Sequence, residues 1–340
     1  MRNAGVGKHR DGCAHAHSAF GIVWLLSLFF FVSSCKPGNA PGPADSQNTP
    51  TNEESPASVP SKLPPRREKI WTDFSGPQAL AEARVLADFG PRPAGTDANK
   101  LVRQHLVDRL IKLGWQTAEQ RFNAHAPDGR DAQFCNLIAR FANVPAAPKR
   151  ILIGAHFDTS GTREFRDVGA SDGAANTAVL VELAWVLALD PQLAGHIELL
   201  FLDGEAPFQE LNLNDGLFGS RFYSQMLRIN QHAGDLHATI LLGNVGTANL
   251  NFAPNSDPTL VGALKQAASV LSIKLEPANR SLRADQVPFS EAGVPSVTLL
   301  DAESPFLHTA DDTTERLDAD SLAKTGNLIL YFVAATITTP

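Results

Sequence analysis

Acidic and imidazole side chains stand at the ends of apolar, strand-like runs of this sequence. For example, His156 follows the run ILIGA, and Glu205 comes shortly after the run IELLFL. The candidates for chemistry among such side chains are His156, Asp158, Asp172, Glu205, Asp285 and His308. In open α/β sheets, ligands bind beyond the carboxyl ends of the strands. We therefore expect these side chains to meet at one edge of a sheet.

A carboxylate together with an imidazole suits Zn²⁺, and a further carboxylate that stays free of the metal suits proton transfer. Each residue alone also has an ordinary structural explanation. Asp172 could cap a helix, His308 could be a hydrogen-bonded loop histidine, and Glu205 could be a solvated acid. Because all of them fall at the same predicted edge, the set predicts a zinc site with acid–base chemistry.

The elements that would position these residues alternate between strand and helix. Strands are expected at residues 120–122, 134–141, 150–156, 197–202, 239–245 and 296–300. Helices are expected from Pro77 to Leu86, from Thr96 to Gly114, and at 174–189, 218–229, 259–271 and 319–334. Runs such as ILIGAH and IELLFLD are apolar almost throughout, which is typical of strands covered by helices on both faces. The alternation predicts one three-layer α/β/α domain.

Composition excludes several classes of function. The chain has 340 residues, with 29 Lys and Arg against 36 Asp and Glu, a formal net charge of −7. This acidic balance gives no electrostatic footprint for nucleic acid or anionic lipid. With three cysteines, neither a disulfide scaffold nor a cysteine-built zinc cluster is expected. The apolar share of 43% is ordinary for a globular protein.

The first 35 residues are predicted to be a targeting segment. Three basic residues occur in the first ten, and an apolar run of 13 residues follows from Phe20 to Val32. This run is shorter than the about 20 residues that span a bilayer, and it suits a signal-peptide core. Val32-Ser33-Ser34-Cys35 then resembles a bacterial lipobox. We expect Cys35 to be lipidated and to anchor the protein in the bacterial cell envelope, outside the cytoplasm. The alternative is an ordinary signal peptide with a chance cysteine.

Residues 36–69 are rich in Pro, Gly, Ser, Asn and charged residues. Such a segment buries too little apolar surface to offset its ordering entropy, so it is predicted to be a disordered tether. The folded domain is expected to span residues 70–340. Cys135 is then the remaining thiol, and its apolar surroundings in residues 134–141 predict a buried position.

The folded part resembles the glutaminyl cyclases (glutaminyl-peptide cyclotransferases), which are relatives of the zinc aminopeptidases. The resemblance runs from about Phe89 to the C-terminus. It is carried by AHFDT at 155–159, GASDGAANTAVLVELAWVL at 169–187, LLFLDGE at 199–205, DGLFGSRFY at 215–223, DQVPFSEAGVPSV at 285–297 and LHTADDTTERLD at 307–318. It implies a central mixed, mostly parallel sheet between helices.

The resemblance also implies roles for individual residues. Asp172 and His308 match zinc ligands of the cyclases. Glu205 matches the glutamate that shuttles a proton, and Asp285 matches an aspartate that forms hydrogen bonds near the site. One bound zinc ion is therefore expected, together with peptide or protein N-termini as substrates.

His156 and Asp158 match an HxD motif that supplies a metal-binding histidine in two-zinc aminopeptidases. They are therefore candidates for an additional metal ligand or for the residues that support the ligands.

The chain departs from the cyclase pattern at several positions. Ala206 stands where a glutamate would be the third zinc ligand, directly after the proton-shuttling glutamate. Gly243 stands where an aspartate is expected after the next strand. Leu211 and Leu307 replace tryptophans that wall the substrate pocket.

Three functions therefore stay open. The chain could be a zinc-dependent acyltransferase that forms N-terminal pyroglutamate with release of ammonia. It could also be an aminopeptidase-like hydrolase, or a metal-poor relative that binds peptide N-termini without catalysis. In each case the expected partners are peptide N-termini and a membrane, reached through lipidated Cys35, and not nucleic acid.

Overall fold

The computed structural model describes residues 65–338, apart from residues 126, 128, 130, 143, 145–146, 148, 162–165 and 280–282. The predicted signal peptide, Cys35 and most of the predicted tether lie outside the described residues. Among the described helices, none combines the length and apolar character needed to cross a membrane.

One eight-stranded mixed sheet forms the centre of the described domain. Its strands are β1 Trp115–His125, β2 Asp131–Phe141, β3 Arg150–His156, β4 Ile197–Leu202, β5 Leu236–Leu242, β6 Asn251–Phe252, β7 Glu276–Pro277 and β8 Ser296–Leu300. They are arranged in the order β1-β2-β4-β3-β5-β8-β6-β7. The four central strands β4, β3, β5 and β8 run parallel, whereas β1 and β2 form a long antiparallel hairpin. All carboxyl ends of the central strands therefore lie at one edge.

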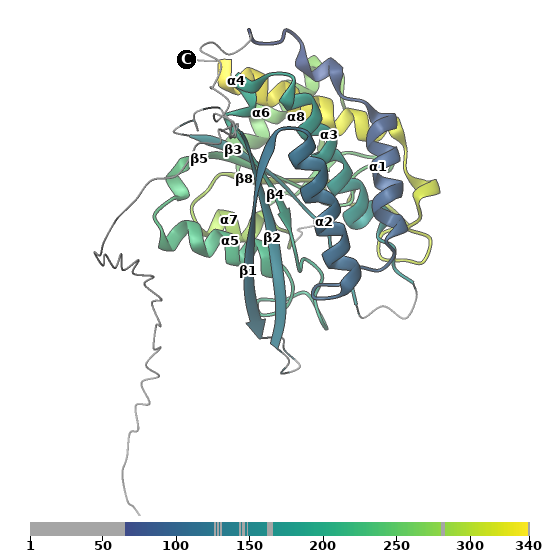
Figure 1. Ribbon diagram of the computed structural model, residues 1–340. Coiled ribbons are helices and arrows are strands. Elements are labelled where there is room, and N and C mark those ends of the chain that lie inside the picture. Colours follow the sequence, from purple (N-terminus) through teal and green to yellow (C-terminus); the bar gives the residue numbers. More distant parts are fainter. Residues whose placement is uncertain are drawn as a thin grey trace, which may run out of the picture. The chain divides into compact units, whose positions relative to one another are not determined.

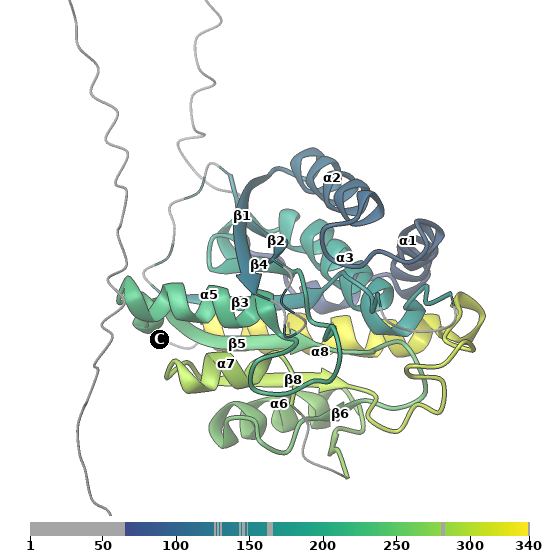
Figure 2. The same ribbon diagram turned by 90° about the horizontal axis from the view of Figure 1, so that it is seen from below.

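Helices cover both faces of the sheet, so the predicted three-layer α/β/α architecture is confirmed (Figure 1; Figure 2). One face is packed by α5 Phe218–Ile229 and α7 Gln286–Glu291. The other is packed by α1 Gly76–Asp88, α2 Asp97–Lys112, α3 Asn176–Ala188, α4 Pro191–Ala194, α6 Pro258–Val270 and α8 Ala319–Thr338. In β3, Ile151 and Ile153 face the larger core while Leu152 faces the smaller one, as the twofold side-chain period of a strand requires.

The predicted boundaries hold closely for the apolar elements. β3, β4, α5 and β8 begin and end at the predicted residues. Thr96 caps α2 as expected, because its Oγ1 accepts a hydrogen bond from the Asn99 N–H at 3.3 Å. The short elements α4, α7, β6 and β7 were not predicted, since two to six residues carry too little periodicity.

The last residues of the predicted tether contact the domain. The Arg66 guanidinium lies 3.3 Å from a carboxylate oxygen of Asp190, and the Arg67 N–H donates to the same oxygen at 3.0 Å. Asp190 also caps α4 and is fully buried. Buried Asp190 therefore holds Arg66 and Arg67, the part of the predicted tether that leads into the domain, against it.

Candidate functional site

The predicted site residues meet at the carboxyl edge of the parallel strands. A cavity of about 310 Å³ lies there. It is lined by His156, Asp172, Glu205, Leu211, Leu242, Gly243, Asn244, Arg283, Ala284, Asp285, Thr298, Leu300, Leu307 and His308. Every residue predicted for catalysis, metal binding or the substrate pocket is in this set, with Asp158 buried directly behind it.

Asp172 lies between two imidazoles. Its Oδ1 is 3.3 Å from His156 Nε2, and its Oδ2 is 3.1 Å from His308 Nε2. Burial alone would raise the pKa of Asp172, but the hydrogen bonds to the two imidazoles outweigh it and hold this pKa well below its usual range. Asp172 is therefore an ionised carboxylate with an imidazole at each oxygen.

A strained turn presents Asp172 to the cavity. Asp172 and Gly173 interrupt the helical backbone of residues 170–175, and Gly173 has φ +118°. A Cβ atom on Gly173 would lie 2.9 Å from both an Arg92 nitrogen and the Asp158 carbonyl oxygen, so only glycine fits. His308 also has a positive φ, of 62°. Non-glycine residues adopt this conformation rarely, and such strain concentrates at functional sites.

Arg92, which the sequence analysis did not single out, holds this turn in place. It is fully buried, and its guanidinium donates to the carbonyl oxygens of Phe157 at 2.6 Å, Val168 at 2.6 Å and Gly169 at 3.1 Å. These contacts tie the end of β3 to the segment that leads into Asp172. Arg92 is thus a structural support of the site.

Asp312 supports the same turn from the C-terminal side. Its carboxylate accepts hydrogen bonds from the N–H groups of Ser171 at 2.8 Å and Asp172 at 3.3 Å. The Asp172 backbone is therefore fixed by residues that are far apart in the sequence.

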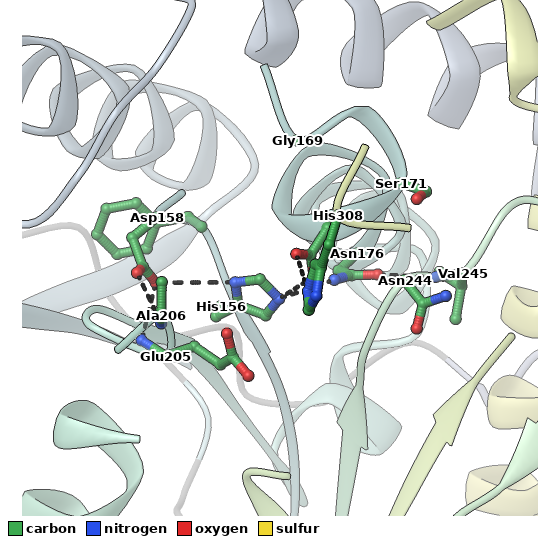
Figure 3. Close-up of polar contacts among 12 residues, drawn as sticks. His156, Asp158, Gly169, Ser171, Asn176, Glu205, Ala206, Asn244, Val245 and His308 are labelled. Atoms are coloured by element: carbon green, nitrogen blue, oxygen red, sulfur yellow. Dashed lines mark hydrogen bonds and ion pairs between the residues drawn. The ribbon is translucent and has the colours of Figure 1, made fainter. Parts of the chain in front are cut away.

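His156 lines the cavity and Asp158 lies behind it, with 3% and 1% of their surfaces exposed. Asp158 accepts hydrogen bonds from the N–H groups of Glu205 at 3.1 Å and Ala206 at 3.3 Å (Figure 3). It therefore positions the backbone that carries Glu205. Burial lowers the pKa of His156, but pairing with Asp158 and Asp172 outweighs it and raises this pKa well above its usual value.

Two carboxyl groups of the cavity have raised pKa values. Burial raises the pKa of Glu205 to about 8, although the positive charge of His156 lowers it. Burial also raises the pKa of Asp285 to about 6, against the lowering effects of His156 and of a hydrogen bond from Ser220. Asp285 is 5% exposed, and its Oδ1 has no hydrogen-bond partner among the described residues. Carboxyl groups with pKa values near neutrality suit proton transfer.

The donor set does not fit a complete catalytic zinc site. Such a site keeps three protein ligands and one open position. Here each oxygen of Asp172 faces one imidazole, and no group of three His, Cys, Asp or Glu side chains in the described residues is arranged to hold a metal ion. A Cβ atom on Gly243 would lie 3.6 Å from the nearest atom, a Thr298 methyl carbon, so there is room where an acidic side chain is missing. Of the three ligands that the expected zinc ion would need, Asp172 and His308 are therefore in place and the third is missing.

Comparison with known proteins agrees with the family resemblance found in the sequence. Residues 136–333 match the family model "Peptidase family M28". A Drosophila melanogaster protein named glutaminyl-peptide cyclotransferase is 27% identical over 302 residues, which covers 80% of this chain and 83% of that protein. The chain is thus similar to glutaminyl-peptide cyclotransferases, as its motifs predicted.

Solved structures of similar fold agree with this resemblance. The crystal structure of an Acidobacteriales bacterium glutaminyl cyclase is 27% identical, with a TM-score of 0.69 over 83% of this chain and 98% of that one. A Zn-dependent exopeptidase from Parabacteroides distasonis has a TM-score of 0.66 over 76% of this chain and 98% of that one. At 23% identity, this second likeness concerns the fold alone.

Proposed function

The chain belongs to peptidase family M28, and from this premise we propose that its cavity binds the free N-terminus of a peptide. The observation that carries the proposal is the pair of carboxyl groups in the cavity. Asp285 Oδ1 is buried without a partner among the described residues, and Glu205 lines the same space. An α-ammonium group would donate a hydrogen bond to Asp285 Oδ1 and bring a positive charge next to both carboxyl groups.

The apolar part of the cavity suits the first side chain of such a peptide. Leu211, Leu300 and Leu307 line it, and they offer apolar surface where the cyclase resemblance expects tryptophans at two of the three positions. Removing apolar surface from water contributes roughly 25 cal/mol per Å². The walls therefore hold the side chain while the carboxyl groups hold the amine.

Within this proposal, the geometry favours a metal-poor relative that binds peptide N-termini. When bound, zinc would act as a Lewis acid that polarises a carbonyl group. Asp172 and His308 would be two of its ligands, but Ala206 offers no third. We derive no step through zinc for this chain, because two ligands leave the metal short of its usual set.

A glutaminyl-peptide cyclotransferase is the second candidate, and the raised pKa of Glu205 favours it. In that reaction the α-amine nitrogen forms a bond to the side-chain carbonyl carbon of an N-terminal glutamine. The bond from that carbon to the amide nitrogen breaks, and ammonia leaves. Glu205 would take the proton from the amine and pass it to the departing nitrogen, a role that typically contributes 10²–10⁴-fold. An aminopeptidase-like hydrolase is supported less, since Gly243 stands where the resemblance expects an aspartate.

One experiment separates these functions. Calorimetry would measure the binding of a Gln-initiated peptide and of its N-acetylated form to the full chain, with ammonia and free amino acids assayed in parallel. We expect binding that requires the free amine and is lost in Glu205→Gln but not in Glu210→Gln, an exposed neighbour on the same loop. Ammonia release would establish the cyclotransferase, and release of amino acids the hydrolase. Equal binding of the acetylated peptide, or no binding, would overturn the proposal.

We also propose that the protein acts while anchored in the bacterial cell envelope through lipidated Cys35. The support is the lipobox-like sequence after an apolar run of 13 residues. A lipid anchor and a long linker would present the cavity to peptides outside the cytoplasm.

A further inference from the structure

Arg283 is a cation that lines the cavity, and none of the roles assigned above uses it. It lies two residues before Asp285 and lines the same space as Glu205 and His308. Its Nε atom is buried and has no hydrogen-bond partner among the described residues. A buried donor without a partner costs about 1–3 kcal/mol, and more when the group is charged. A ligand could therefore supply the hydrogen-bond acceptor that Arg283 Nε lacks.

The acidic groups nearby are committed elsewhere. Asp172 has an imidazole at each of its oxygens, and in the proposed complex Glu205 and Asp285 face the α-ammonium group of the peptide. The positive charge of Arg283 also acts on Arg221, whose pKa is lowered first by burial and then by the charge of Arg283. An anion beside Arg283 would relieve this repulsion between two cations.

The chemistry of the guanidinium group indicates which anion fits. Its planar fork of N–H donors matches the two oxygens of a carboxylate, and such bidentate pairs are among the strong hydrogen bonds of proteins. The same cavity also presents the carboxyl groups of Glu205 and Asp285. The cavity thus offers sites for one positive and one negative group on the same ligand.

We propose that the cavity selects peptides that carry a carboxylate close to their free N-terminus, and that Arg283 is the residue that determines this specificity. The inference rests on the proposed function, because it assumes that the α-ammonium group occupies the Glu205 and Asp285 side. The carboxylate has two sources. It is either the side chain of an acidic residue next to the N-terminal one, or the C-terminal carboxylate of a dipeptide.

Three peptides distinguish these sources in a calorimetric test on the full chain. They are Gln-Ala-Ala-amide, which has no carboxylate, Gln-Glu-Ala-amide, which has a side-chain carboxylate, and the dipeptide Gln-Ala with a free C-terminus. For wild type we expect one or both acidic ligands to bind about 10- to 100-fold more tightly than the neutral peptide, the range for a charge-assisted hydrogen bond. Arg283→Gln should bind all three with the affinity of the neutral peptide.

Two further variants keep the test sharp. Arg283→Lys keeps the charge and loses the fork, so it should retain only part of the preference. Arg84→Gln, at an exposed position of α1, should keep the full preference. Binding of all three peptides with equal affinity would overturn this inference and leave the proposed function standing. A preference that persists in Arg283→Gln would also overturn it. Absence of binding to every peptide would overturn the proposed function itself, and the inference with it.

Discussion

Replacement of Ala206 by glutamate should increase the zinc affinity of the cavity. Asp172 Oδ2 and His308 Nε2 are 3.1 Å apart. Two ligands about 2.0–2.1 Å from a tetrahedral zinc ion lie about 3.3 Å from each other. The pair is therefore already spaced as two zinc ligands, and the missing element is a third donor. Position 206 follows Glu205 directly, so a new carboxylate would leave Glu205 free.

The size of the effect follows from the free energy of zinc binding per ligand. Four-ligand zinc sites in peptides bind with about 10–16 kcal/mol, or roughly 2.5–4 kcal/mol per ligand. One added ligand should thus lower the zinc dissociation constant by about 10²- to 10³-fold. The Ala206 N–H is held by Asp158 at 3.3 Å, which fixes the start of the new side chain. Pro207 favours an extended backbone at residue 206. A backbone that turned the new side chain away from the metal would reduce the gain in zinc affinity.

The measurement is a zinc titration of wild type and Ala206→Glu against a competing chelator at constant pH. Ala206→Gln is the matched control, because its side chain has the same length but a neutral amide that binds zinc poorly. We expect a weak wild type, a much tighter glutamate variant and a glutamine variant like wild type. If wild type already binds one zinc ion tightly and the glutamate variant gains nothing, another residue such as His156 or Glu205 completes the site, and our account of Ala206 is wrong.

Three other predictions follow from the structure. The pKa of Glu205 is about 8 in the folded protein against its usual 4.5, so the folded state binds more protons between these pH values. As the pH rises from 4.5 to about 8, the free energy of unfolding of metal-free wild type should therefore fall relative to that of Glu205→Gln. Urea denaturation at several pH values would measure this difference. Arg92→Met should lower the free energy of unfolding by about 3–5 kcal/mol in the same assay, because it removes a buried, hydrogen-bonded cation. A loss below 1 kcal/mol would contradict the role of Arg92 as a structural support of the site. Cys35→Ala should release the protein from membranes in fractionation, and continued tight association would refute the lipid anchor.

The sheet and its major helices could be predicted because their apolar runs are long. β3, β4 and β8 are buried along nearly their whole length, so continuous hydrophobicity marks both ends of each strand. The hairpin is different. β1 spans 11 residues with a mostly exposed pattern, and only residues 120–122 were predicted as strand. Its length depends on pairing with β2, which is a tertiary property that composition does not encode.

The site could be predicted in its residues but not in its contacts. The positions of Asp172, Glu205 and His308 after strands were enough to place them at one edge. Arg92 and Asp312 fix the Asp172 turn from distant parts of the chain, and no local pattern connects an arginine to a carbonyl oxygen 76 residues away. Arg283 was missed for a related reason. Arg283 stands out because its buried Nε atom has no hydrogen-bond partner among the described residues, and this can be seen only in the three-dimensional packing.

Two departures from the cyclase pattern, Ala206 and Gly243, have one consequence for charge. Ala206 lies on the loop after β4, and Gly243 follows β5, so two separate loops each lack a carboxylate. A zinc ion would bring two positive charges to the cavity. Without it, the positive charges that face Glu205 and Asp285 belong to His156, whose pKa is raised, and to Arg283. These cations sit on fixed side chains, so they attract an anionic group of the ligand to a defined place but cannot take a carbonyl oxygen as a metal ligand. We therefore propose that these two substitutions favour recognition of a charged peptide end over zinc-dependent turnover.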